Sequence, residues 1–192
     1  MEVNIEIKTL EIAGFYSVLQ ALRLPFGKDC RSIGSWSGHL DEWLDDPCAP
    51  IELHTECDLK ICDKDITLMS TLVKRGDEHA KAIRGLIVYA EINAPRYLWS
   101  ELDTYYVGSQ RLSSESTMHI QGRGLNTEEL VAMKEALPEG TMQKRVQYFS
   151  YQTLRRIYYQ RKDHRLPHWH KFCEWIESLP FAKELILIKK DI

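Results

Sequence analysis

Aromatic rings, carboxylates and hydroxyl groups are concentrated in residues 94–119, directly after an apolar segment. The rings, among them Tyr105, have flat faces that can stack on a planar ring of a ligand. The serines, among them Ser109 and Ser116, can orient a bound molecule by hydrogen bonding. The carboxylate of Glu101 can accept hydrogen bonds from a base or a ribose, with pairing to a nearby basic side chain as the alternative. The stretch predicts a pocket for a flat, polar molecule, with burial in the core or at a subunit interface as the alternative for its rings.

A basic segment lies between residues 144 and 165 and carries seven lysines and arginines. Such a local excess suits a phosphate-bearing small molecule. Arginine is well matched to phosphate, because its guanidinium donates two parallel hydrogen bonds. On a helix, however, Arg155, Arg156 and Arg161 cannot share one narrow stripe. A solvated basic face is therefore the alternative to a phosphate site.

The composition of the whole chain narrows the class of protein. With 192 residues, 44% hydrophobic residues and a formal net charge of −3, it is typical of a globular protein and not of a general nucleic-acid binder. No apolar run approaches the roughly 18 residues that span a membrane, and no secretory signal is recognisable. The five cysteines are irregularly spaced, which favours reduced thiols. We therefore expect a cytoplasmic protein without a membrane partner.

Neither the cysteines nor the histidines predict a metal site. Cys57 and Cys62 lack the two-residue spacing of a zinc knuckle. His164 and His168 have helical spacing, but Pro167 lies between them and disrupts that geometry. We expect no metal.

Hydrophobic periodicity predicts an α+β fold that is rich in helices and has few strands. Residues 27–51 show no sustained period and are expected to form a long loop. The whole chain, 1–192, is expected to be a single domain. The last segment, 181–188, is expected to be a helix or a strand. Strands are expected over 3–7 and 83–92, and helices over 15–24, 63–75, 97–106, 127–137, 142–162 and from 167 onward.

Six separated pieces of the chain resemble, in order, motifs of the flavin-dependent thymidylate synthases, the thymidylate synthase-complementing family. The likeness is greatest to a diverged, phage-associated branch with a Trp-x-Glu-x-Asp-Thr-Tyr segment. Together the pieces span about residues 65–180. They are Glu78-His79, Ile92–Pro95, Trp99–Gly108, Ser116–His119, Leu154 with Arg161, and Trp169–Pro180.

The resemblance implies an antiparallel or mixed sheet flanked by helices, a homotetramer, and active sites built by several subunits. It also implies binding of a deoxyuridine monophosphate and of a flavin, FAD. NADPH and methylenetetrahydrofolate are implied if the family reaction is retained. By the same resemblance, Glu78 and His79 match a pair at the flavin site, and Arg161 matches an arginine that contacts the nucleotide.

The chain departs from the family pattern where the family binds phosphate. Thr104–Tyr106 stands in place of an Arg-His-Arg triplet that holds flavin and nucleotide phosphates. Ser109 keeps the serine that follows this triplet. Ser150 stands where an asparagine is expected, eleven residues before Arg161. A shared fold is therefore better supported than a shared reaction.

Two functions follow as alternatives. The first is an enzyme that modifies a pyrimidine deoxynucleotide such as dUMP. Arg161 would hold the phosphate, Ser109 and Ser116 would bond nearby oxygens, Glu101 would accept hydrogen bonds, and Tyr105 would stack. The second is a non-catalytic protein that binds or sequesters a nucleotide on the same oligomeric scaffold. Both bind a small-molecule nucleotide, and neither needs a nucleic-acid polymer.

Overall fold

A computed structural model of the protein describes residues 4–28 and 61–189. Four strands form one antiparallel sheet in the order β1-β2-β4-β3. Most of the expected 27–51 loop, together with Cys30, Cys48 and Cys57, lies outside the described residues. The strands are β1 Glu6–Ala13, β2 Ile87–Pro95, β3 Ser109–Ser114 and β4 Met142–Ser150.

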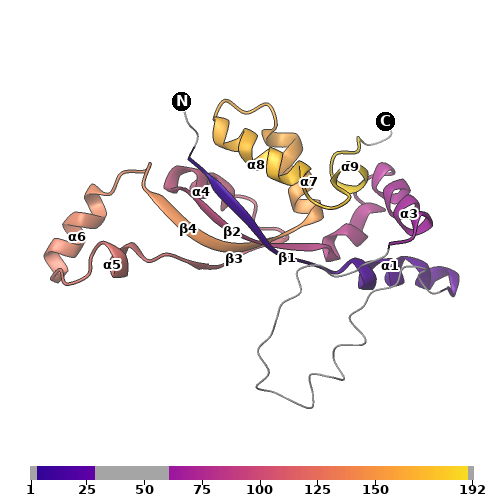
Figure 1. Ribbon diagram of the computed structural model, residues 1–192, viewed down its shortest axis with the longest axis horizontal. Coiled ribbons are helices and arrows are strands. Elements are labelled where there is room, and N and C mark those ends of the chain that lie inside the picture. The colour runs from indigo at the N-terminus through magenta and orange to yellow at the C-terminus, as the bar shows by residue number, and fades with distance from the viewer. Residues whose placement is uncertain (1–3, 29–60, 190–192) are drawn as a thin grey trace, which may run out of the picture.

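Helices cover one face of this sheet and extend beyond both of its ends, as Figure 1 shows. Helices α4, α7, α8 and α9 lie over the sheet, α1 and α3 lie at one end, and α5 and α6 project from the other. The predicted α+β fold, an antiparallel sheet flanked by helices, is confirmed. The helices are α1 Phe15–Arg23, η1 Leu24–Phe26, α3 Asp63–Lys74, η2 Ala80–Gly85, α4 Arg96–Leu102, α5 Thr117–Ile120, α6 Thr127–Ala136, α7 Tyr151–Arg161, α8 Pro167–Glu177 and α9 Ala182–Leu185.

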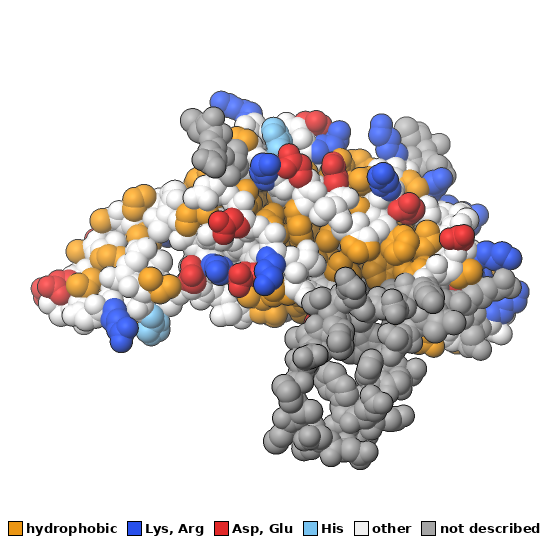
Figure 2. All heavy atoms as spheres, in the orientation of Figure 1, with side chains coloured by type: hydrophobic (Ala, Val, Ile, Leu, Met, Phe, Trp, Pro, Cys, Tyr) orange, Lys and Arg blue, Asp and Glu red, His pale blue; other side chains and the backbone are white. Residues whose placement is uncertain are grey.

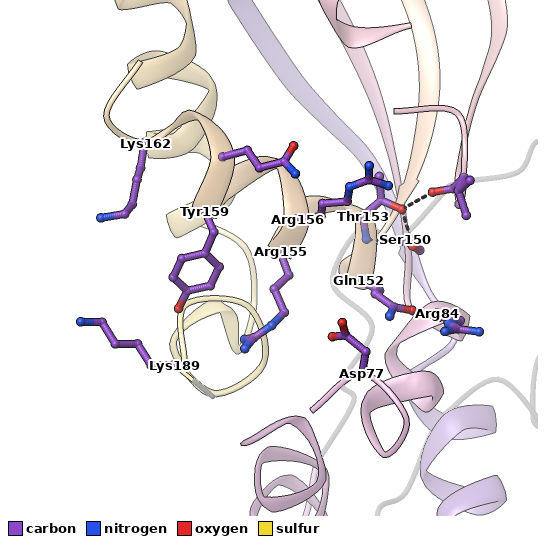
Figure 3. Close-up of a pocket in the computed structure, with 13 residues that line it drawn as sticks. Asp77, Arg84, Ser150, Gln152, Thr153, Arg155, Arg156, Tyr159, Lys162 and Lys189 are labelled. Carbon is purple, nitrogen blue, oxygen red and sulfur yellow. Dashed lines mark hydrogen bonds between the residues drawn. The ribbon is translucent and has the colours of Figure 1, made fainter. Parts of the chain in front are cut away.

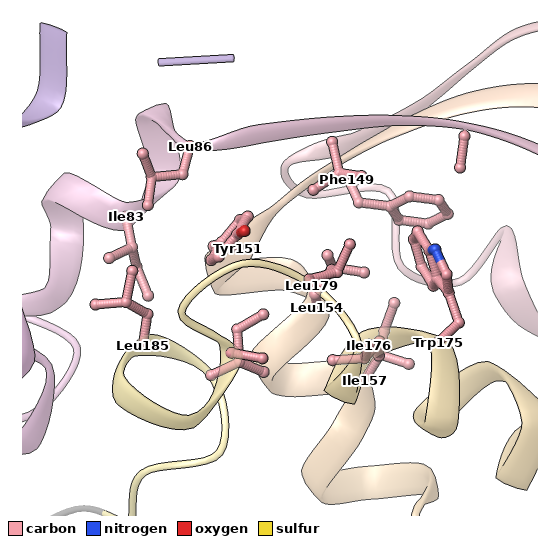
Figure 4. Packing of buried hydrophobic residues seen from close by; sticks show 14 of the residues in the cluster. Ile83, Leu86, Phe149, Tyr151, Leu154, Ile157, Trp175, Ile176, Leu179 and Leu185 are labelled. Atoms are coloured by element: carbon pink, nitrogen blue, oxygen red, sulfur yellow. The ribbon is translucent and has the colours of Figure 1, made fainter. Parts of the chain in front are cut away.

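The hydrophobic core lies between the sheet and these helices. Alternate residues of β2, from Val88 to Ala94, are fully buried, as the two-residue period of a strand requires. Figure 4 shows Tyr151 and Leu154 of α7 pointing into the same layer as Ile176 of α8. The core thus fixes α7 and α8 against the sheet, and with them the side chains that these helices present.

The segment 142–162 was expected to be one long helix, and this prediction is wrong. It forms strand β4, which pairs with both β2 and β3, and then helix α7. The apolar spacing of Val146 and Phe149 fits a helix as well as a strand, and local periodicity cannot distinguish them. Pairing on both sides favours the strand, and two polar side chains of β4, Arg145 and Gln147, are buried on its core face.

Several other elements differ from expectation at their bounds. The strand expected over 3–7 runs over Glu6–Ala13, and the strand expected over 83–92 begins at Ile87. Residues 109–114, for which no strand was predicted, form the edge strand β3. The remaining predicted helices are present, although the one expected over 97–106 ends at Leu102. Within the described residues, no helix is long and apolar enough to span a bilayer.

Candidate functional site

Helix α7 organises the candidate site, because it begins where the central strand β4 ends. The side chain of Ser150 caps this helix, with the Thr153 amide donating to Ser150 Oγ at 3.2 Å. The sheet therefore fixes the direction of α7. Its arginines project toward two different regions, an open cavity and a closed cluster.

The open region, here called the basic cavity, has a volume of about 990 Å³ and lies along the length of α7 (Figure 3). Its walls come from η2, the loop before β3, α7 and the C-terminal segment. A cavity of this size falls within the range that small-molecule sites occupy. One carboxylate, that of Asp77, lines it. Five basic side chains line it as well: Arg84, Arg155, Arg156, Lys162 and Lys189.

The loop before β3 is fixed tightly against the start of α7. Gly108 has a φ of 74°, and a Cβ built there would lie 2.6 Å from Thr153 Oγ1. The Thr153 hydroxyl donates to the Val107 carbonyl at 2.7 Å, and the Ser150 amide donates to the Gly108 carbonyl at 2.7 Å. This wall of the basic cavity is therefore preorganised and leaves no room for a larger residue at position 108.

Arg155 is the buried cation of the cavity and forms part of its wall. It is 6% exposed, donates from Nη1 to the Ile186 carbonyl at 2.9 Å, and lies over the ring of Tyr159 at 5.3 Å. Burial lowers the pKa of its guanidinium, while Tyr159 and Asp77 act in the opposite direction. Arg155 therefore ties the C-terminal segment to α7.

The other basic side chains of the cavity are exposed, and they are the groups that can reach a ligand. Figure 3 shows Lys162 and Lys189 at one end of the cavity and Arg84 at the other. Arg84 donates from Nε to the Gln152 side chain. Exposed cations grouped around a concave surface concentrate an anionic ligand there. The arrangement suits a molecule with one or more phosphate groups.

The closed region, here called the Arg161 cluster, joins three of the predicted site residues. Arg161 donates from Nη1 to Glu101 Oε2 at 2.8 Å and from Nε to the Tyr105 hydroxyl at 2.8 Å. The same Glu101 oxygen accepts from Trp169 Nε1 at 2.9 Å, and His164 Nε2 lies 3.9 Å from it. The guanidinium also lies over the Trp169 ring at 4.5 Å. Arg161 is thus neutralised and held within the protein.

Ser109 and Ser116, although close in sequence, lie in different surroundings. Ser109 is buried at the start of β3, where its hydroxyl accepts from Gln147 Nε2 at 2.6 Å. Ser116 caps the short helix α5, with the His119 amide donating to its Oγ at 3.3 Å. Figure 1 shows α5 at the far end of the molecule from α3. Within one chain, Ser116 is therefore not brought to the basic cavity.

Glu78 and His79 lie in the turn between α3 and η2, where both side chains are exposed. They follow Asp77, which lines the basic cavity, but they are not among the lining residues themselves. They lie beside the cavity because they belong to the same turn as Asp77.

The histidines near the C-terminus are engaged in contacts within the protein. His170 Nε2 lies 2.7 Å from the His164 carbonyl, and His168 Nε2 lies 3.0 Å from the Tyr97 hydroxyl. Over residues 4–28 and 61–189, no group of three potential ligands is placed to hold a metal ion. Cys173 is buried, which raises the pKa of its thiol to about 12.

Several residues of the basic cavity were not anticipated from the sequence. Arg84 and Lys189 lie outside the basic segment, and Tyr159 was not singled out from its aromatic neighbours. Gln152 is uncharged, so the search for charged residues in the sequence did not select it. The only available signal was the helical spacing of Gln152, Arg155, Arg156 and Tyr159, which places them on adjoining faces of one helix.

Comparison with known proteins bears on the fold. No protein-family model and no curated protein sequence matches the chain. A crystal structure of the flavin-dependent thymidylate synthase ThyX from Helicobacter pylori, complexed with FAD and dUMP, is similar with a TM-score of 0.62 and 14% identity. The match covers 96% of this chain and 100% of that one.

A second similar structure is the UMP/dUMP methylase PolB from Streptomyces cacaoi, bound with 5-Br dUMP. Its TM-score is 0.58 at 11% identity, over 95% of this chain and 92% of that one. Both similarities run over almost the whole of the described chain, and both concern arrangement in space and not sequence. The protein therefore has the fold of the flavin-dependent thymidylate synthases.

Proposed function

We propose that the protein binds a pyrimidine nucleotide such as dUMP, with the phosphate in the basic cavity. The observation that carries the proposal is the charge of that cavity, where five cations face one carboxylate. Arg156, Lys162 and Lys189 are exposed there and can approach phosphate oxygens. The similar structures from Helicobacter pylori and Streptomyces cacaoi hold dUMP and 5-Br dUMP, which supports this class of ligand.

A flavin is the cofactor that this proposal includes, and the cavity residues fit part of it. The exposed cations suit the diphosphate of FAD, and the ring of Tyr159 adds an aromatic surface. Bound flavin, once reduced, supplies hydride for modification of a base. Arg84, at the other end of the cavity from Lys162 and Lys189, would bind the flavin diphosphate, while those two lysines hold the nucleotide phosphate. NADPH and methylenetetrahydrofolate enter the proposal only with the complete family reaction.

A second candidate function, binding without catalysis, is favoured by two observations. The Thr104–Tyr106 stretch supplies no basic side chain, and its Tyr106 is exposed. Arg161, which the resemblance assigns to the nucleotide, is already paired with Glu101 at 2.8 Å. A protein of this kind would retain a phosphate-binding cavity and sequester the nucleotide.

The proposal also includes a homo-oligomer, a homotetramer by resemblance, formed by the whole chain in the cytoplasm. The α5–α6 arm, residues 117–136, buries none of its own helical side chains. Figure 2 shows hydrophobic side chains on the surface of this projecting part. Met118, Ile120 and Val131 are exposed there, and contact with a second copy would cover them. Light scattering should report more than one chain, and an Ile120→Ser, Val131→Ser variant should shift the mass toward the monomer.

A thermal-shift panel with absorbance spectra tests the proposed function. The purified protein is incubated with dUMP, UMP, dCMP and inorganic phosphate, each with and without FAD. We expect dUMP to raise the melting temperature more than phosphate does, because ligand binding to the native state stabilises it. A yellow protein that oxidises NADPH in the presence of dUMP identifies the enzyme. A colourless protein stabilised by dUMP alone identifies the second candidate, and no response to any nucleotide contradicts both.

A further inference from the structure

A second, smaller cavity of about 370 Å³ is lined in part by residues that come directly before and after Val107 and Gly108, which line the basic cavity. It is formed by the end of α4, the following loop, the start of β3, and β4. Three aromatic or apolar side chains, Leu102, Tyr105 and Tyr106, contribute to its lining. Its polar lining residues are Asp103, Ser109, Gln110, Arg111 and Gln147.

Gln147 is the unusual residue of this smaller cavity. The register of β4 turns its side chain toward the core face of the sheet, where it is 3% exposed. Its Nε2 donates to Ser109 Oγ at 2.6 Å, but its Oε1 has no hydrogen-bond partner among the residues that the structure describes. Buried polar atoms without a partner are rare and costly in native proteins, so this oxygen calls for a donor.

The surroundings of Gln147 are held in place by contacts within the protein. Arg145 Nη1 donates to both carboxylate oxygens of Asp103 at 3.1 Å, and its guanidinium lies over the Trp99 ring at 4.4 Å. The Tyr105 hydroxyl accepts from Arg161 Nε at 2.8 Å. These contacts hold Asp103 and Tyr105, two of the lining residues, in place before a ligand binds.

The Gln147–Ser109 pair has a definite hydrogen-bonding pattern. Gln147 Oε1 is an acceptor. The Ser109 hydroxyl already accepts from Gln147, which leaves its own hydrogen to be donated. One acceptor beside one donor is complementary to an N–H group next to a C=O group. A planar ring with that edge would also meet the ring of Tyr105.

We infer that this smaller cavity binds a pyrimidine-2,4-dione ring, with its N3–H donated to Gln147 Oε1 and an adjacent carbonyl accepting from Ser109 Oγ. Uracil bases and the isoalloxazine of flavins both contain this ring. The inference rests on the proposed function only in the choice of these two probes. A cytosine ring has the reversed pattern and would not match the pair in this orientation.

Binding of neutral probes tests the inference separately from the phosphate site. Deoxyuridine and 3-methyldeoxyuridine, and riboflavin and 3-methylriboflavin, are titrated against the full-length protein by ligand-observed NMR. We expect N3-methylation to weaken binding of at least one probe pair by about tenfold or more, because the buried acceptor then stays unpaired. The pair that shows the effect identifies the source of the ring.

A matched set of variants connects the effect to Gln147. Gln147→Met keeps the length of the side chain and removes the acceptor, and Gln20→Met makes the same change on α1. We expect Gln147→Met to weaken the unmethylated probe by about tenfold and to abolish the discrimination against methylation. Its melting temperature should change little, because removal of the unpaired buried oxygen offsets part of the loss of the hydrogen bond to Ser109. Gln20→Met should leave probe affinity unchanged.

Three results would overturn the inference. They are equal binding of methylated and unmethylated probes, unchanged affinity in Gln147→Met, and binding of neither deoxyuridine nor riboflavin. The probes carry no phosphate, so the proposed function fails by a different result. That result is the absence of any stabilisation by dUMP while one neutral probe still binds.

Discussion

Helix α7 presents arginines to two regions that differ in how their charge is balanced. In the Arg161 cluster, the guanidinium is bound by Glu101 and Tyr105 at 2.8 Å and covered by Trp169. In the basic cavity, the only lining carboxylate among the described residues for Arg156 and its basic neighbours is that of Asp77, and Lys162 also pairs with the exposed Asp163 at 3.1 Å. The first region has the character of a structural contact, and the second that of a binding surface.

This difference shows that crowding of basic residues in a sequence does not by itself identify a phosphate site. The carboxylate that neutralises Arg161 belongs to Glu101 of α4, sixty residues before it, and the ring that covers its guanidinium belongs to Trp169 of α8, eight residues after it. A charge that is satisfied within the fold contributes to stability, whereas an unsatisfied group of charges attracts a ligand. The predictions below test that division, from the largest expected effect to the smallest.

Removing the carboxylate of the Arg161 cluster should cost the most stability. Glu101→Gln leaves a partly buried guanidinium without its counter-charge and weakens the acceptor of the Trp169 indole. We expect the free energy of unfolding to fall by about 2–3 kcal/mol, measured by urea denaturation. A double-mutant cycle with Arg161→Gln should recover part of the loss. If Glu101→Gln were as stable as the parent, the cluster would not be structural.

Arg155 should behave as a structural residue although it lines the basic cavity. Arg155→Met keeps much of the apolar stem but loses the hydrogen bond to the Ile186 carbonyl. We expect a loss of about 2 kcal/mol, because the charged donor is replaced and a buried carbonyl is left unpaired. Amide hydrogen exchange should accelerate in α9. Unchanged exchange there would show that Arg155 does not hold the C-terminal segment.

The exposed cations of the basic cavity should affect binding and not stability. Arg156→Gln and Lys162→Gln should each weaken dUMP about tenfold, because each removes one charge-assisted contact to phosphate. Unfolding free energies should change by less than about 0.5 kcal/mol. Lys171→Gln on α8 is the control, since Lys171 pairs with Glu174 outside the cavity. Equal losses for Lys171→Gln would indicate a nonspecific charge effect.

The smallest effect is expected at His168. Burial lowers the pKa of its imidazole below the ordinary value of 6.5, so the unfolded state binds the proton more tightly. The contribution to stability is complete above pH 6.5 and is lost as the pH falls from there through the lowered pKa. We expect this contribution to the free energy of unfolding to be less than about 0.5 kcal/mol, because the imidazole is in contact with solvent. The measurement is the urea denaturation midpoint of the parent and of His168→Asn between pH 5 and 8. As the pH falls below 6.5, the midpoint of the parent should decrease slightly more than that of His168→Asn.

The sequence was informative where local patterns decide the structure. The helices α1, α3 and α6 follow from apolar spacing, and in the structure α6 begins with an Asn126–Glu129 capping box. Strand β4 could not be distinguished from a helix. Its identity depends on pairing with residues that are 47 to 63 positions earlier in β2 and 31 to 40 positions earlier in β3. Local periodicity carries no information on such pairing.

The candidate site was predictable only in part, for the same reason. Glu101, Tyr105 and Arg161 were singled out separately, and tertiary structure brings them together. Their mutual hydrogen bonds depend on distances in the folded protein that the sequence spacing does not specify. Gln147 was not predicted as a site residue, because an uncharged amide side chain gives no signal of function in a sequence. Only the register of β4 shows that it is buried with one oxygen unpaired.

Calorimetric titration of dUMP at low and high salt tests the division between the two regions most directly. The account predicts that Arg156→Gln with Lys162→Gln weakens binding about a hundredfold and reduces its salt dependence, since two screened charges are lost. Arg161→Lys, which keeps the charge beside Glu101, should retain affinity within about threefold. Undiminished binding by the double variant, together with loss of binding in Arg161→Lys, would contradict the account.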